Sequence, residues 1–169
     1  MKKLILVRHA KSDRKGDPAI ADIDRPLAER GRKEAAQLAK FLQKEDLIPE
    51  LIFCSPSVRT RETLTVMLKK WDKEVEVNYK NKIYDNDKSQ ILKLISKAYD
   101  SIGILMVIGH NPSIEDLANQ LSNGRIPFGK FSTSGAAAFE LEIDSWGDVI
   151  NERSKLILYY SPKKGKISK

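Results

Sequence analysis

The chain has 169 residues, the size of one ordinary domain, and can hold a core without disulfide or metal support. Hydrophobic residues make up 41% and charged residues 31%, which excludes a membrane protein and argues against a disordered chain. The net charge is +7, but four of the surplus lysines lie between residues 162 and 169. The rest of the chain is too weakly basic to demand a nucleic-acid partner, and an anionic small ligand or an acidic protein surface suits it equally well.

Strand-like and helix-like patterns alternate along most of the chain. Apolar runs at 3–7, 51–54 and 102–108 predict buried strands. Apolar residues at helical spacing predict helices around 35–42, 91–98 and 114–121. Two strand-like runs in succession, 136–143 and 156–160, indicate antiparallel strands at the sheet edge. The predicted fold class is therefore α/β, with a mostly parallel central sheet and helices on both faces.

We expect a single domain over residues 1–161, followed by a basic, flexible tail over 162–169. The N-terminal apolar stretch is only four residues long before Arg8 ends it, too short for a signal peptide. One cysteine, Cys54, excludes an internal disulfide framework and any all-cysteine metal site. A cytoplasmic monomer is the expectation.

The two histidines of the chain each follow a predicted strand. His9 ends the run Leu4–Val7–Arg8–His9, and His110 ends the run that leads through Gly109. In open α/β sheets, ligands bind at the carboxyl ends of the strands. The sequence therefore predicts that both histidines lie at one binding crevice.

Two arginines are expected beside these histidines. Arg8 precedes His9, and Arg59 follows the second strand in Ser55-Pro56-Ser57-Val58-Arg59, where we predict Ser55 as the helix N-cap with Pro56 in the first turn. Asn111 and Pro112 repeat this pattern after His110. Two helix N-termini and two arginines would make an anion pocket suited to a phosphoryl group.

Such a pocket favours a histidine nucleophile over a metal ligand. Two histidines without a nearby carboxylate and cysteine cluster make a poor metal site, so we predict no metal and no cofactor. Attack on phosphorus spreads negative charge over three equatorial oxygens, which arginines stabilise. Neighbouring arginines also favour the neutral, nucleophilic form of His9 by lowering its pKa. His110, if protonated once phosphate is bound, can stabilise the same oxygens.

These residues resemble the histidine phosphatase superfamily, also called phosphoglycerate-mutase-like, and within it the SixA-like phosphohistidine phosphatase branch. The resemblance rests on residues 6–12, on Asp24-Arg25-Pro26-Leu27 with Gly31, on Ser55-Pro56 with Arg59 and Thr63, and on residues 109–112. It covers residues 3–143 and implies that His9 is the phosphorylated nucleophile. It also implies that Arg8, Arg59 and His110 complete the phosphate pocket, and that Ser12 and Asn111 contact the substrate. Arg25 is a further candidate substrate contact, and an ion pair with Asp24 that fixes the loop is the alternative for it.

A general acid is the part of the family pattern that this sequence lacks. Much of the superfamily carries a glutamate in the region that here includes Asp85 and Asp87, the only carboxylates there. Asp87 is also a natural N-cap for the following helix. Our hypothesis is that no strong general acid is present. This would suit a phosphoramidate, whose imidazole leaves more readily than an alkoxide.

The leading prediction is a metal-independent phosphatase acting on protein phosphohistidine. A small-molecule phosphomonoesterase of the same superfamily is the enzymatic alternative. A non-catalytic phosphoprotein-binding module is the alternative from another class. A mutase is disfavoured because the spans between motifs leave no room for the segments that enclose its substrate. The expected partner is a phosphorylated protein or small phosphorylated molecule, with no nucleic acid and no membrane.

Overall fold

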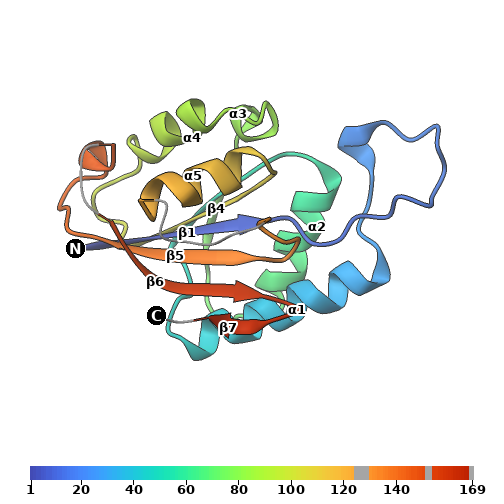
Figure 1. The fold of residues 1–169 in the computed structure, drawn as a ribbon, viewed down its shortest axis with the longest axis horizontal. Helices are drawn as coiled ribbons and strands as arrows, with labels where there is room; N and C mark the ends of the chain where they lie inside the picture. The colour runs from blue at the N-terminus through green and yellow to red at the C-terminus, as the bar shows by residue number, and fades with distance from the viewer. Residues whose placement is uncertain (124–129, 151–153, 168–169) are drawn as a thin grey trace.

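A single seven-stranded sheet forms the middle of the molecule (Figure 1). The structure, a computed structural model, describes residues 1–123, 130–150 and 154–167. The strands are β1 (Lys2–Arg8), β2 (Leu51–Cys54), β3 (Glu76–Tyr79), β4 (Ile104–Gly109), β5 (Ala136–Leu141), β6 (Ser154–Ser161) and β7 (Gly165–Ile167). Their order is β3-β2-β4-β1-β5-β6-β7, with β1 to β4 mutually parallel and the last three strands antiparallel to their neighbours. The predicted fold class is confirmed.

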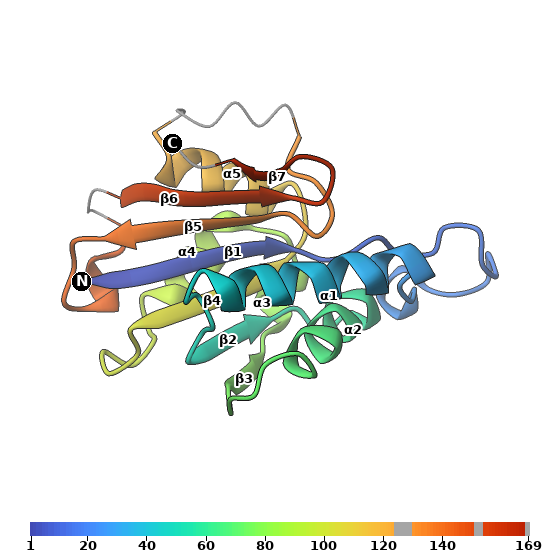
Figure 2. The ribbon, with the colours of Figure 1, turned by 90° about the horizontal axis from the view of Figure 1, so that it is seen from below.

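Helices cover both faces of this sheet. Figure 2 shows α1 (Glu29–Lys44) and α2 (Val58–Leu68) on one face. The other face carries α3 (Asn81–Tyr84), α4 (Lys88–Ile95) and α5 (Ser113–Leu121), and two short 3-10 turns, η1 (Asp22–Asp24) and η2 (Trp146–Asp148), lie in loops. Within the part of the chain that the structure describes, no helix combines the length and hydrophobicity needed to cross a membrane.

The core is divided in two by the sheet because successive strand residues point to opposite faces. In β1, Leu4 and Leu6 join the cluster beneath α4 and α5, whereas Ile5 and Val7 join the cluster beneath α1 and α2. All four side chains are fully buried. This double burial explains why the central strands are continuously apolar instead of alternating.

The predicted elements are present, with shifts at their ends. The strand predicted at 102–108 begins two residues later, at Ile104, and the helical pattern 91–98 ends at Ile95. Ala98 lies beyond that helix but still packs against the core. The edge strand β3 was not predicted: its residues are exposed or half-buried, so its hydrophobic pattern is weak.

The C-terminal segment differs from the predicted flexible tail. After β6, a turn over residues 162–164 leads into β7, which pairs antiparallel with β6 and whose first residue, Gly165, has a φ of +64°. Glycine adopts this left-handed conformation without strain. The free edge of β6 supplies the hydrogen-bonding groups for β7. Residues 168 and 169 lie outside the described residues.

Close packing between α1 and the loop after His9 helps to position the site. A Cβ atom at Gly31 would lie 2.2 Å from the backbone oxygen of Lys11, so no larger residue fits there without movement. The same oxygen accepts a hydrogen bond from the Ala28 backbone N–H at 2.9 Å. The N-terminal turn of α1 therefore holds the loop that follows β1 against the sheet edge.

Candidate active site

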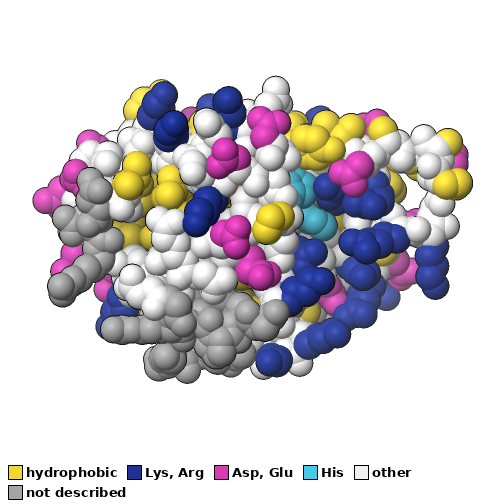
Figure 3. All heavy atoms as spheres, turned by 45° about the horizontal axis from the view of Figure 1, so that its top comes forward, with side chains coloured by type: hydrophobic (Ala, Val, Ile, Leu, Met, Phe, Trp, Pro, Cys, Tyr) yellow, Lys and Arg dark blue, Asp and Glu magenta, His cyan; other side chains and the backbone are white. Residues whose placement is uncertain are grey.

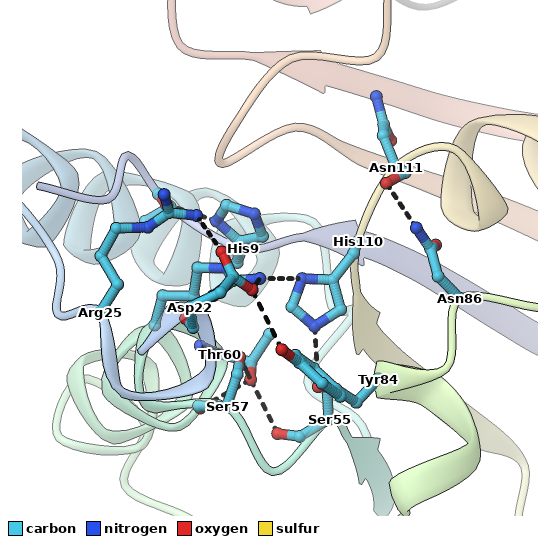
Figure 4. A network of polar contacts seen from close by, with 12 residues as sticks. His9, Asp22, Arg25, Ser55, Ser57, Thr60, Tyr84, Asn86, His110 and Asn111 are labelled. Atoms are coloured by element: carbon cyan, nitrogen blue, oxygen red, sulfur yellow. Dashed lines mark hydrogen bonds and ion pairs between the residues drawn. The ribbon is translucent and has the colours of Figure 1, made fainter. Parts of the chain in front are cut away.

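Both histidines lie at the carboxyl edge of the sheet because β1 and β4 are adjacent and parallel, with Arg8 paired to Gly109. Their ring centroids are 5.2 Å apart. They line a cavity of about 350 Å³ (Figure 4). The other residues that line the cavity are Arg8, Arg14, Asp22, Arg25, Arg59, Tyr84, Asn86 and Asn111. The structure thus brings together the four residues predicted as the phosphate pocket, Arg8, His9, Arg59 and His110.

The hydrogen bond of His9 defines which ring nitrogen is free. Its Nδ1 lies 2.7 Å from the backbone oxygen of Ala10. A carbonyl only accepts hydrogen bonds, so Nδ1 carries the proton and Nε2 keeps its lone pair. Burial lowers the pKa of His9 to about 3, assisted by the charges of Arg59 and Arg8 and only partly opposed by the bond to Ala10. At neutral pH the ring is neutral, with Nε2 available to attack.

The two arginines at the cavity are each held by a backbone carbonyl. Arg8 Nη1 donates to the backbone oxygen of Phe131 at 2.7 Å, and Arg59 Nη1 donates to that of Asp22 at 2.6 Å. The Nε atoms of both arginines are buried and have no hydrogen-bond partner among the described residues. Burial lowers the pKa of Arg8, but a guanidinium stays protonated under ordinary conditions. The positive charges of Arg8 and Arg59 at the cavity therefore suit an incoming oxyanion.

The second histidine is held between an arginine and a serine. Arg59 Nη2 lies 3.3 Å from His110 Nδ1, and Ser55 Oγ lies 2.7 Å from His110 Nε2. Arginine can only donate, so Nδ1 accepts and the neutral ring donates from Nε2 to Ser55. Burial, followed by the charge of Arg59, lowers the pKa of His110 to about 4, and Asp22 acts in the opposite direction. A bound anion would raise this pKa and allow Nδ1 to donate.

The helix after β2 begins differently from the prediction. Ser57, and not Ser55, is the N-cap of α2, and its side chain accepts from the Thr60 backbone N–H. Ser55 is instead used by His110, as described above. Arg59 is nevertheless on the first turn of α2, as predicted. Thr63 connects this turn to the loop after His9, because its hydroxyl accepts a hydrogen bond from the Ala10 backbone N–H at 3.0 Å and donates one to the Arg59 carbonyl.

Asn111 does not cap α5 as predicted, since Pro112 is in the N-cap position and no side chain caps the helix. Asn111 Nδ2 donates to Glu115 and to the Phe131 carbonyl, and its Oδ1, buried, has no partner among the described residues. Asn111 still lines the cavity, although its side chain points away from the two histidines (Figure 4).

The remaining predicted substrate residues are split between two places. Arg25 lines the cavity and donates to Asp22 Oδ1 at 2.7 Å, so its ion pair is with Asp22 and not with the adjacent Asp24. Ser12 is buried, forms an isolated bridge with Leu27 and lines a neighbouring cavity. Ser12 therefore lies beside the phosphate pocket, outside its lining.

The carboxylate at the site is Asp22, which the sequence reasoning missed. Its Oδ2 lies 3.0 Å from Arg59 Nη2 and 3.1 Å from the Tyr84 hydroxyl. Partial burial acts to raise the pKa of Asp22, but the charges of Arg59 and Arg25 and the Tyr84 hydrogen bond outweigh it, so the net pKa is lowered. Asp22 is in a loop without hydrophobic periodicity, and its sequence carried no signal beyond its closeness to Arg25.

The acidic residues considered as general acids are not at the cavity. Asp85 and Asp87 are both exposed, whereas their neighbours Tyr84 and Asn86 line the cavity. Asp87 caps α4 through a 2.8 Å bond from the Ser89 backbone N–H, as the sequence indicated. Neither Asp85 nor Asp87 is therefore placed to protonate a leaving group.

Over residues 1–123, 130–150 and 154–167, no cluster of three or more histidine, cysteine or acidic side chains could hold a metal ion. Cys54 is buried, and burial raises the pKa of its thiol to about 12, so it is not a reactive thiolate.

The low histidine pKa values predict an acid-sensitive fold. Between about pH 3 and pH 6.5 the unfolded chain binds more protons than the folded chain, so the free energy of unfolding falls as the pH falls through this window. We expect a loss approaching about 1.4 kcal/mol per pH unit for each histidine. Denaturant unfolding at several pH values measures it. The His9→Gln/His110→Gln variant should show a clearly flatter dependence, and an unchanged slope would contradict the low pKa values.

The edge of the sheet thus presents two histidines and two arginines to one cavity, an arrangement suited to an anion such as a phosphoryl group. Residues 4–82 match the family model of the histidine phosphatase superfamily, branch 1. The chain is 34% identical over 154 residues to an uncharacterised chloroplastic protein of Arabidopsis thaliana, covering 86% of this chain and 69% of the relative. It is 32% identical over 167 residues to an uncharacterised protein of Mycobacterium leprae, covering 93% and 100%. The chain belongs to the histidine phosphatase superfamily.

Its fold places it within one branch of that superfamily. A protein of Agrobacterium tumefaciens assigned as the phosphohistidine phosphatase SixA superposes with a TM-score of 0.81 at 26% identity, over 95% of this chain and 98% of the other. The chain is a phosphatase of the SixA-like branch, as the sequence motifs indicated.

Proposed function

We propose that the chain is a metal-independent phosphatase that hydrolyses phosphohistidine on proteins through a covalent intermediate on His9. The observation that carries this proposal is the protonation state of His9. Its Nδ1–H is bound to the Ala10 carbonyl, which leaves an unprotonated Nε2 in a cavity that also holds Arg8 and Arg59. A ring fixed in this tautomer is a nucleophile and not an acid.

The proposed reaction has two displacements. In the first, the substrate imidazole takes a proton from solvent on its other ring nitrogen, the lone pair of His9 Nε2 attacks phosphorus, and the P–N bond to the substrate breaks so that the substrate leaves as neutral imidazole. In the second, water attacks the phosphoryl group, the P–Nε2 bond breaks, and inorganic phosphate and neutral His9 are released after the water loses its proton. Arg8 and Arg59 neutralise the equatorial oxygens in both steps, a contribution that arginine charge can make without a metal.

The nature of the leaving group is inferred from the state of Asp22. Its pKa is lowered, so it is ionised at neutral pH and cannot donate a proton while paired with Arg59. An alkoxide leaving group needs such a donor, whereas the weaker P–N bond of a phosphoramidate depends on it less. This supports phosphohistidine over an alkyl phosphate.

The test is phosphate release from a phosphohistidine-bearing protein in excess EDTA, with an alkyl phosphate ester assayed in parallel. We expect release from phosphohistidine that EDTA does not change, and at least about a hundredfold slower release from the ester, the usual scale of missing acid catalysis. Faster turnover of the ester would instead favour the small-molecule phosphomonoesterase. Saturable binding of the phosphoprotein without release would favour a binding module.

Asp22 is predicted to compete with the substrate phosphate for Arg59. In Asp22→Asn the negative charge is gone, so inorganic phosphate should inhibit about three- to tenfold more strongly, a modest gain because the carboxylate is half exposed and screened. Turnover of phosphohistidine should stay within a few fold. Product-inhibition kinetics measure both quantities.

A matched control is Asp24→Asn, which removes the same charge from an exposed residue of η1 that does not line the cavity. It should leave phosphate inhibition unchanged. A fall in kcat of more than about a hundredfold in Asp22→Asn, on both phosphohistidine and the alkyl ester, would show that Asp22 is a proton donor and contradict this prediction.

A further inference from the structure

A second cavity of about 350 Å³ adjoins the phosphate pocket and shares three residues with it, Arg8, His9 and Arg14. Its other lining residues are Lys11, Ser12, Lys130, Thr133 and Lys163. We call it the basic pocket. Because it shares the reacting histidine, a molecule whose phosphoryl group is at His9 can extend directly into it.

The charges of the basic pocket come from three separate segments. Lys11 and Arg14 are in the loop after β1, Lys130 precedes β5, and Lys163 is in the turn between β6 and β7. All four are exposed, and none forms an ion pair with a described residue. Figure 3 shows Lys and Arg side chains continuing in a band from the two histidines along one side.

Among the residues that the structure describes, none lining the basic pocket is acidic, whereas in the phosphate pocket Asp22 forms ion pairs with Arg25 and Arg59. Positive charges gathered at one place repel one another, and a bound anion would relieve this repulsion. The pocket is therefore complementary to a second negative region on the substrate.

We propose that the basic pocket binds acidic side chains that flank the phosphohistidine of a protein substrate; this rests on the proposed function. The phosphoryl group is already matched by Arg8 and Arg59 in the phosphate pocket, whose planar guanidinium groups suit the fixed geometry of a compact phosphate. The basic pocket offers mainly exposed lysines, which act as mobile point charges without a required geometry. Several carboxylates on an extended peptide segment fit this arrangement better than one further phosphate.

The test compares two phosphohistidine peptides, one with Asp and Glu beside the histidine and one with Asn and Gln in their place. We expect kcat/KM to be about tenfold higher for the acidic peptide at low ionic strength and the preference to shrink at about 1 M salt, where the Debye length falls to about 3 Å. Lys130→Gln/Lys163→Gln should remove most of the preference while leaving hydrolysis of a small aryl phosphate unchanged. Equal rates for the two peptides with the wild type would overturn the proposal.

A matched control is Lys93→Gln/Lys97→Gln, which removes the same charge from exposed residues that line neither cavity. This variant should keep the preference for the acidic peptide. If it loses as much of that preference as Lys130→Gln/Lys163→Gln does, the preference depends only on net charge and the pocket assignment is wrong.

An inhibition assay separates this proposal from the proposed function. An unphosphorylated acidic peptide should inhibit aryl phosphate hydrolysis by the wild type and should inhibit Lys130→Gln/Lys163→Gln about tenfold less. This difference in inhibition is expected even if the enzyme hydrolyses no phosphohistidine peptide. Such a lack of hydrolysis would contradict the proposed function but not the assignment of the basic pocket. The opposite result would be that pyrophosphate inhibits, that this inhibition depends on the two lysines, and that the acidic peptide does not inhibit. It would assign the pocket to a second phosphate and overturn the proposal.

Discussion

His9→Asn is expected to reduce phosphate release by at least about ten-thousandfold, because the other histidine of the cavity, His110, has both ring nitrogens engaged by Arg59 and Ser55. Asparagine approximates the size of the ring and lacks the lone pair of Nε2. The measurement is single-turnover release from a radiolabelled phosphohistidine protein. After acid-free quenching, the wild type should carry transient label on its own chain and His9→Asn should carry none.

His110→Asn serves as the comparison for this experiment. His110 is the other buried histidine of the cavity, but its Nδ1 accepts from Arg59 and its Nε2 contacts Ser55. It should lower the rate without preventing labelling of the chain. If His9→Asn is still labelled and His110→Asn is not, the two roles are reversed.

Arg59→Gln is expected to lower kcat by about a hundred- to thousandfold, the usual effect of removing one donor to a developing charge. The geometry supports an effect on kcat more than on KM, because Arg59 contacts His110 and Asp22 as well as the cavity. Binding of tungstate, an oxyanion similar to phosphate, should weaken in parallel. Steady-state kinetics and oxyanion titration measure these effects.

Arg61→Gln provides a control from the same helix. Arg61 stacks its guanidinium over the Tyr79 ring, at 5.2 Å from the ring centroid, and does not line the cavity. Its loss should change kcat by less than about twofold, within the range of ordinary surface substitutions. A comparable fall in both variants would mean that the decrease reflects α2 as a whole and not the Arg59 charge.

The fold and the four pocket residues could be predicted because they depend on strong local patterns. The runs that form β1 and β4 are buried on both faces, and a residue that directly follows such a strand must lie at the sheet edge. His9 and His110 come together because β1 and β4 are also adjacent and parallel, an order that the sequence did not predict. The edge strand β3 had no such pattern, since one side of it faces solvent.

Asp22 and Ser55 could not be placed by the same reasoning. Asp22 reaches Arg59 across the sheet edge from a loop separated from it by 37 positions, a contact that no periodicity encodes. Ser55 and Ser57 are both acceptable N-caps for α2. Which of them caps the helix depends on which hydroxyl is hydrogen-bonded to His110. Long-range hydrogen bonds, and not local propensity, decide both cases.

The hydrogen bond from His9 to the Ala10 carbonyl has a consequence for turnover. In many catalytic sites a carboxylate holds the imidazole and increases its basicity. Here the acceptor is an uncharged peptide group of the next residue. A less basic imidazole is a better leaving group, so in the proposed reaction the phosphorylated enzyme gives up its phosphoryl group to water readily. The contact with the Ala10 carbonyl thus orients the ring while raising its pKa less than a carboxylate would, and burial keeps the pKa of His9 low.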